Sequence, residues 1–327
     1  MKKQKIVTIG GGSGSFMVLT GLKKYPVDLS AIVSMADDGG SSGVLRDELG
    51  VLPPGDVRQC LVALSKSSRI LRELFNYRYD NGGLKGHTFG NLFLSTLEKI
   101  TGGLDSAIKE ASRILRVKGE IYPVTLNKKA KLIALLKNGK RIVSEDKIYR
   151  NTRDLVNLQH LYLKPAAELN PDIIPIIKQA DKIIINPGDL YSSIIPNFLV
   201  KGMREALSNT RAKIIYVGNL TNKPGHTDDF TLVDYVKTLE KYFGRGVIDY
   251  VIYNKEKPAE KFLKKYSRLR KNLVTAGDLS QLPKIKFLGH NLLSHKIFQA
   301  KRSDTLGHLR SLIRHDPRKL AKIICNI

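Results

Sequence analysis

The chain has 327 residues, of which 42% are hydrophobic, and this proportion suits a folded core and excludes an intrinsically disordered chain. No apolar run approaches the ~20 residues that a membrane-spanning helix needs. Three glycines end the short apolar run after the basic start, so we expect no signal peptide. Cys60 and Cys325 form no C-x-x-C pair, which argues against a zinc site or a disulfide framework. We expect one cytoplasmic domain over residues 1–327, with no membrane attachment.

The formal net charge of +25 is unevenly spread along the chain. Residues 201–327 carry 26 basic and 11 acidic side chains, against 13 and 9 in residues 1–100. A basic excess favours polyanionic partners or phosphorylated small molecules, and it equally fits a general preference for lysine. The basic stretch at residues 255–271 has no RNA-binding signature around it, so we do not expect nucleic acid to be the partner.

Short β-branched runs alternate with amphipathic stretches along most of the chain. The patterns predict strands at residues 5–9, 29–35, 180–185, 213–217 and 247–253, and helices at residues 16–25, 57–65, 90–100, 194–206, 231–242 and 258–269. Repetition of strand, loop and helix is typical of βαβ units. The predicted fold class is therefore α/β, with a doubly wound, mostly parallel, Rossmann-like sheet.

One segment breaks this alternation. Residues 119–126 and 133–143 look like antiparallel strands, and Asn138-Gly139 is a typical hairpin turn. We interpret about residues 105–153 as a small antiparallel β insertion. It would serve as a lid, a dimer arm or a simple decoration of the sheet.

The first candidate binding motif is the glycine loop at residues 10–15, between the first strand and the first helix. Glycines let the backbone approach an anion closely, and the N–H groups of the next helix point at it. The loop is neither a P-loop nor a regular G-x-G-x-x-G motif, and a plain tight turn is the alternative. The residues predicted to bind phosphate are Gly11, Gly12, Ser13 and Gly14.

The second candidate motif, Asp37–Gly43, follows the second predicted strand. Ligands of wound sheets lie beyond the carboxyl ends of the strands, and an acid at this spacing often binds a ribose. Two adjacent carboxylates also suit Mg²⁺, which is the one cofactor that the sequence suggests. A solvated acidic turn is the alternative. The candidate residues are Asp37, Asp38, Gly39, Ser41 and Ser42, with the first two as metal ligands.

Further polar residues follow other predicted strands or begin helices. Arg58 lies in a first helical turn, with Asp56 as the expected N-cap, and His87 and Asn91 are spaced to face one site. Loops at predicted strand ends meet at one edge of a parallel sheet, and this convergence favours a nucleotide site. The later loops contribute Gly188, Tyr191, Ser192, Asn219, Thr227 and Asp228.

Together these motifs resemble, over nearly the full length, the bacterial gluconeogenesis-factor family. That family binds UDP-N-acetylglucosamine and is grouped with the 2-phospho-L-lactate transferases of coenzyme F420 synthesis. The resemblance implies a nucleotide-sugar ligand and roles in cell shape and in central-carbon or cell-wall supply. It also implies that Tyr266 and Arg314 lie near the uridine or the sugar. The sequence departs from the family pattern at Asp189, whose carboxylate would repel a phosphate unless a metal lay between them.

Three functional hypotheses follow. The first is a non-catalytic nucleotide-sugar-binding regulator, which we expect to be a homo-oligomer with a protein partner. The second is a Mg²⁺-dependent transferase of the 2-phospho-L-lactate type, against which the absence of tryptophan and of an aromatic cluster for a deazaflavin weighs. The third is an RNA-binding or membrane-surface protein, whose binding would fall steeply with salt.

Overall fold

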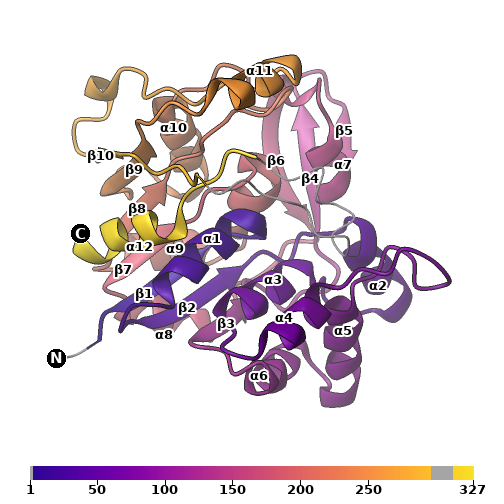
Figure 1. Cartoon of the computed structure of the whole chain (residues 1–327). Helices are drawn as coiled ribbons and strands as arrows, with labels where there is room; N and C mark the ends of the chain where they lie inside the picture. Colours follow the sequence, from indigo (N-terminus) through magenta and orange to yellow (C-terminus); the bar gives the residue numbers. More distant parts are fainter. Residues whose placement is uncertain (1–2, 296–311) are drawn as a thin grey trace.

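A computed structural model describes residues 3–295 and 312–327. Its main sheet is parallel throughout and has the strand order β10-β9-β8-β7-β1-β2-β3 (Figure 1). This arrangement confirms the predicted α/β class and doubly wound, mostly parallel sheet. The strands are β1 (Lys5–Ile9), β2 (Asp28–Val33), β3 (Glu120–Pro123), β7 (Lys182–Ile185), β8 (Lys213–Val217), β9 (Tyr250–Asn254) and β10 (Lys286–His290).

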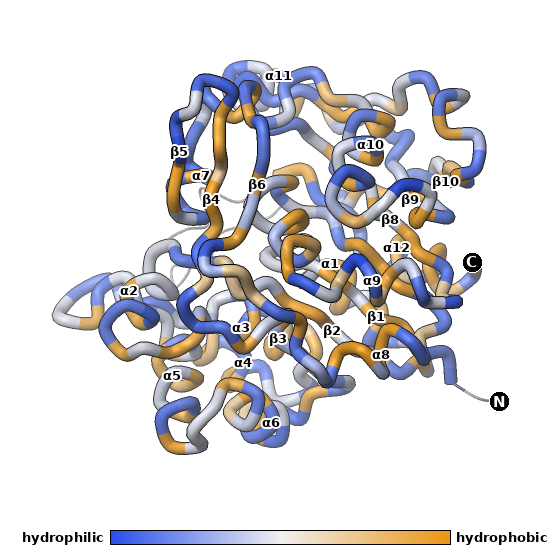
Figure 2. Tube along the Cα trace, turned by 180° about the vertical axis from the view of Figure 1, so that it is seen from behind, coloured by the Kyte–Doolittle hydropathy of each residue, from blue (hydrophilic) through white to orange (hydrophobic). Residues whose placement is uncertain are grey.

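Helices cover the sheet because its central strands are apolar on both sides. On one face α1 (Gly12–Leu22) packs between α3 (Gly55–Leu64) and α12 (Pro317–Asn326). On the other face α9 (Met203–Ser208) contacts both α8 (Ile173–Gln179) and α10 (Leu232–Phe243). Figure 2 shows the hydrophobic residues gathered along the strands and the inner sides of these helices. The other α-helices are α2 (Gly40–Leu49), α4 (Arg69–Asn76), α5 (Phe89–Thr101), α6 (Leu104–Ile114), α7 (Glu145–Arg150) and α11 (Glu260–Arg268).

The order of connections reverses between β1 and β7. The chain passes from β1 towards β2 on one side and from β7 towards β8 on the other, and right-handed crossovers then place the intervening helices on opposite faces. Ile9 is level with both Ile32 and Ile185, so the carboxyl ends of β1, β2 and β7 are aligned. Such a switch point is where wound sheets bind ligands.

The first helix starts earlier than predicted. It begins at Gly12 rather than at residue 16, so most of the glycine loop is its first turn. The predicted helix at 194–206 is also wrong. There the chain forms a π-helical turn, η2 (Leu190–Ile194), a 3₁₀ turn, η3 (Ile195–Asn197), and then α9, because Pro196 and Gly202 interrupt a continuous helix.

The antiparallel insertion is real, but its predicted bounds need correction. Residues 120–123 form β3, which pairs in parallel with β2, and α6 packs on α5, so the segment from residue 105 to β3 belongs to the main fold. The separate sheet has the order β5-β4-β6 and carries α7. The predicted turn at Asn138-Gly139 does join β4 to β5. The strands are β4 (Lys131–Leu136), β5 (Arg141–Val143) and β6 (Leu158–Lys164).

Candidate functional site

The glycine loop forms the N-terminus of α1, where Gly11 is the N-cap and Gly12, Ser13 and Gly14 make the first turn. A Cβ atom on Gly14 would lie 1.6 Å from the carbonyl oxygen of Pro187, so only glycine allows the loops after β1 and β7 to touch here. Gly12 differs, because its φ is +63° and an added Cβ would meet no atom within 4 Å. The loop therefore faces open space at Gly12.

The loops after β1 and β7 are also joined by hydrogen bonds. Asn186 donates its side-chain amide to Ser15 Oγ at 2.9 Å and its backbone N–H to the carbonyl of Ile9 at 2.9 Å. These contacts fix the N-terminus of α1 against the second loop. The structure thus brings the predicted glycine loop and the predicted loop that contains Gly188 together at the switch point.

Asp56 reaches this N-terminus from α3. Its Oδ1 accepts the backbone N–H of Gly12 at 2.9 Å, and a Cβ on Gly11 would lie 1.9 Å from its Oδ2. Burial, followed by the charge of Asp37, raises the pKa of Asp56 to about 7. The predicted N-cap role of Asp56 is wrong, since Pro54 is the N-cap of α3 and the carboxylate bonds to another helix instead.

The two adjacent aspartates after β2 belong to different networks. Asp37 accepts the N–H of Gly39 at 3.1 Å and a hydrogen bond from Ser42, and burial raises its pKa despite them. Asp38 instead accepts hydrogen bonds from Ser144 Oγ (2.8 Å) and the N–H of Asp146 (2.9 Å), both in the insertion. The following residues start α2, with Gly39 as N-cap and Ser41 and Ser42 buried in its first turn.

This division bears on the predicted magnesium site. Asp38 lies 3.6 Å from Arg46 as well as bonding to the insertion, so it does not present a free carboxylate beside Asp37. Within the described part of the chain, no three His, Cys, Asp or Glu side chains are grouped as metal ligands. The residues therefore do not form a ready-made cation site, and magnesium stays a prediction.

Four predicted residues form one hydrogen-bonded chain. Arg58 donates to Asn91 Oδ1 at 2.9 Å, Asn91 donates to Ser41 Oγ at 3.1 Å, and Ser41 Oγ lies 3.1 Å from His87 Nδ1. The guanidinium of Arg58 also bonds to Asn76 Oδ1 at 2.6 Å. These contacts connect α2, α3 and α5, so the residues come together as predicted, with Arg58 bound to two amides.

Asp189 has its counter-charge within the protein. Lys223 Nζ lies 2.6 Å from Asp189 Oδ2, and His226 Nδ1 lies 3.8 Å from Oδ1. Burial acts to raise the pKa of Asp189, but the charges of Lys223 and His226, with hydrogen bonds from Lys223 and Ser192, together hold it below its ordinary value. A metal between Asp189 and a phosphate stays a prediction, and within the protein the counter-charge of this carboxylate comes from Lys223.

The same lysine connects the sheet to the insertion. Lys223 Nζ lies 3.6 Å from the ring centroid of Tyr149, and the ring of His226 bonds to the carbonyl of Asn151 at 2.6 Å. Glu145 of α7 also faces this region, and burial followed by the charge of Asp37 raises its pKa well above the ordinary range. Sequence reasoning missed Lys223, Tyr149 and Glu145, since no local pattern relates the insertion to the loop after β8.

The residues predicted at later strand ends lie along the same edge. Asn219 donates to the carbonyl of Gly188 at 2.7 Å and accepts from Tyr216, while Tyr191 and Ser192 are buried in η2. Thr227 and Asp228 stabilise the loop after β8. The side chain of Thr227 accepts the N–H of Lys223, and that of Asp228 accepts the N–H of Gly225. Beyond β8 and β9 a cavity of about 190 Å³ opens, lined by Asn219, Leu220, Leu232, Tyr253, Asn254, Lys255, Glu256, Lys257, Leu273, Val274 and Thr275.

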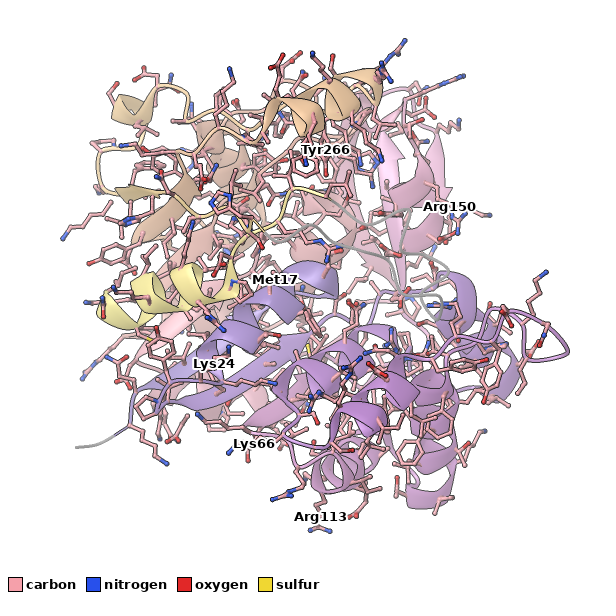
Figure 3. The ribbon with its side chains drawn as sticks, in the orientation of Figure 1. Met17, Lys24, Lys66, Arg113, Arg150 and Tyr266 are labelled. Atoms are coloured by element: carbon pink, nitrogen blue, oxygen red, sulfur yellow. The ribbon has the colours of Figure 1, made fainter. Side chains whose placement is uncertain are left out.

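Tyr266 is 4% exposed, and its hydroxyl accepts the N–H groups of Leu312 and Ile313 at 2.8 and 3.2 Å. It therefore holds in place the segment that carries Arg314. The side chain of the next residue, His315, bonds to the backbone of Gly218 at the end of β8. In Figure 3, Met17 on α1, Arg150 on α7 and Tyr266 on α11 mark the elements around this part of the molecule.

The sequence profile of the family described as 2-phospho-L-lactate transferase CofD matches residues 6–296. The chain belongs to this family. It is 36% identical to the gluconeogenesis factor of Bacillus subtilis over an alignment of 328 positions, which covers 100% of this chain and 98% of the relative. The gluconeogenesis factor of Halalkalibacterium halodurans is 36% identical over 316 residues, with 96% and 95% of the two chains covered.

A solved structure supports the same relationship. The crystal structure of a UPF0052 family member from Bacillus halodurans matches with a TM-score of 0.89 and 32% identity, covering 99% of each chain. The family resemblance inferred from the motifs is confirmed by these comparisons. Among the helices of residues 3–295 and 312–327, none combines the length and apolarity that crossing a bilayer requires.

Proposed function

We propose that this CofD-family protein binds a nucleotide sugar of the UDP-N-acetylglucosamine type and acts as a cytoplasmic regulator. The regulated processes would be central-carbon and cell-wall metabolism and cell shape. Support for a role near gluconeogenesis comes from relatives that are named gluconeogenesis factors and align over nearly the whole chain. A non-catalytic regulator would transmit its state through a protein partner, and assembly as a homo-oligomer is part of the same proposal.

The observation that carries the proposal is the N-terminus of α1 at the switch point. Gly12 faces open space there, and α1 begins directly beyond the carboxyl end of β1. The first turn of a helix of this length has a partial positive charge and N–H groups without acceptors in the helix itself, which suit a diphosphate. The N–H of Gly12 is bonded to Asp56 in this structure. The loop after β7 meets the start of α1 through the Asn186–Ser15 hydrogen bond, and the loop after β8 meets the loop after β7 through the Asn219–Gly188 hydrogen bond.

The cavity beyond β8 and β9 would take the other end of the ligand. Its walls combine leucines with amides and with the ring of Tyr253, a mixture that suits a base or a sugar. Asn219 borders both the cavity and the Gly188 loop, so the cavity and the glycine loop lie along one edge of the sheet. In this proposal the nucleotide sugar occupies both.

Isothermal titration calorimetry with UDP-N-acetylglucosamine, with and without Mg²⁺, tests this proposal. We expect saturable binding with no product formed. Absence of binding under both conditions would contradict the proposed ligand and direct the search to other nucleotides.

The second candidate is a Mg²⁺-dependent transferase of the 2-phospho-L-lactate type. The matching family profile is described by that activity, and the carboxyls of Asp56 and Glu145 both have raised pKa values, as acid–base groups do. Mixing the protein with a nucleotide-activated phospholactate, an acceptor and Mg²⁺ separates the candidates. Metal-dependent turnover would replace the regulator proposal.

A further inference from the structure

The carboxylate of Asp56 bonds to the N-terminus of α1, where the proposed function places a ligand phosphate. It accepts the N–H of Gly12 at 2.9 Å, although it belongs to another helix 44 residues further along the chain. Gly11 provides the room for this contact, because a Cβ there would lie 1.9 Å from Asp56 Oδ2. The absence of a side chain at Gly11 therefore admits an anion that the protein itself supplies.

The surroundings of Asp56 are otherwise unfavourable to a charge. Asp37 faces it from the end of β2 and Glu145 from α7, and both carboxylates repel it. The opposing groups are the charge of Arg58 and the amide of Gln59, whose Nε2 lies 3.5 Å from Oδ1. Among these contacts the hydrogen bond to Gly12 is the short one, so the N-terminus of α1 is the main local attraction for this carboxylate.

We propose that Asp56 is an internal competitor that occupies the anion position of the glycine loop and must leave it when a phosphate binds. The inference rests on the proposed binding of phosphates at α1. A phosphate and the Asp56 carboxylate need the same N–H group, and two negative charges at one helix terminus repel each other. Asp56 thus selects against weakly bound anions, because a ligand needs further contacts to displace it.

Removal of the Asp56 charge tests this role. At pH 8.5, where Asp56 with its pKa of about 7 is ionised, we expect D56N to bind inorganic pyrophosphate at least about tenfold more tightly than the wild type, since a charge-assisted hydrogen bond no longer competes. D56S, which keeps an acceptor without a charge, provides a second variant if D56N does not fold. D105N is the matched control, because Asp105 also lies in a first helical turn, at the start of α6.

Calorimetry with pyrophosphate compares the affinities of the wild type and all variants, and thermal unfolding shows whether each variant is folded. Tighter binding by D56N or D56S, with D105N equal to the wild type, supports the inference. Unchanged or weaker binding by the Asp56 variants, no binding by any protein, or an equal gain in D105N overturns it. In the wild type, the amide resonance of Gly12 should move when pyrophosphate is added, and a static resonance would also contradict displacement.

A parallel titration with UDP-N-acetylglucosamine separates this inference from the proposed function. If no variant binds the nucleotide sugar while D56N still gains affinity for pyrophosphate, the competitor role stands and the proposed ligand fails. If the wild type binds the nucleotide sugar and D56N binds it no more tightly, the proposed ligand stands and the competitor role fails.

Discussion

Lys223 and Asp189 balance each other's charge between the loops after β7 and β8. The Asp189 side chain is 7% exposed and that of Lys223 is 23% exposed, so each charge depends on the other for much of its solvation. Removing one member of such a pair leaves a charge that is buried and unpaired. The loop after β7 and the loop after β8 therefore depend on this contact.

We expect K223M to lower the free energy of unfolding by about 2 kcal/mol, less than for a fully buried pair because Lys223 is partly exposed. Adding D189N should restore part of this loss, because the unpaired carboxylate is then gone. Urea denaturation measures both changes, and K201M, which removes an exposed ion pair with Glu168, should have almost no effect. Equal destabilisation in K223M and the double variant would contradict the pairing.

His315 makes a separate prediction about pH. Burial lowers its pKa from 6.5 to about 4, so the unfolded chain binds a proton over a range where the native protein does not. The neutral imidazole of His315 therefore contributes its full share of the free energy of unfolding above about pH 6.5, and this share is lost as the pH falls towards 4. The loss amounts to about 3 kcal/mol.

The difference in unfolding free energy between the wild type and H315Q isolates this effect from carboxyls that titrate in the same range. We expect the wild type to lose about 3 kcal/mol relative to H315Q between pH 6.5 and 4. H290Q, at an exposed histidine, should follow the wild type. A difference that stays constant with pH would show that His315 is protonated equally in both states.

At the scale of elements, α1 explains why the glycine loop was recognisable and why its boundary was not. Strand β1 and the glycines after it are local signals, and both were predicted at the right positions. The start of the helix at Gly12 depends on partners from Pro187 and Asp56, which no local pattern reveals. The parallel pairing of β3 with β2 and the contact of Lys223 with Tyr149 of the insertion also join residues that are distant in sequence, so no local pattern predicted them.

The close packing of α1 on the loop after β7 leads to a stability prediction. G14A places a Cβ 1.6 Å from the carbonyl oxygen of Pro187, and backbone atoms must move to relieve it. We expect a loss of about 3 kcal/mol in unfolding free energy, despite the better helix propensity of alanine. G83A, in an exposed position where a Cβ meets no atom within 4 Å, should change stability little, and equal effects would contradict the tight contact.

For the whole molecule, the sheet order determines which predicted residues can act together. Alternating strands and helices made the α/β class predictable, and the switch point between β1 and β7 then gathers loops that are distant in sequence. The sequence could indicate these loops but not which side chains remain available to a ligand. The structure shows that Arg58, Asn91 and Ser41 bond to one another, while Gly12 faces open space.

The most direct test of the central claim compares nucleotide-sugar binding by the wild type, G12D and G82D. Gly12 and Gly82 have φ angles of +63° and +64°, and an added Cβ at either would meet no atom within 4 Å, so the substitutions impose similar backbone strain. G12D places a negative charge where the diphosphate should lie. Calorimetry should show that G82D binds UDP-N-acetylglucosamine like the wild type and that G12D binds at least about a hundredfold more weakly, because juxtaposed like charges cost several kcal/mol. Equal affinity of G12D and the wild type would contradict the assignment of the ligand to the N-terminus of α1.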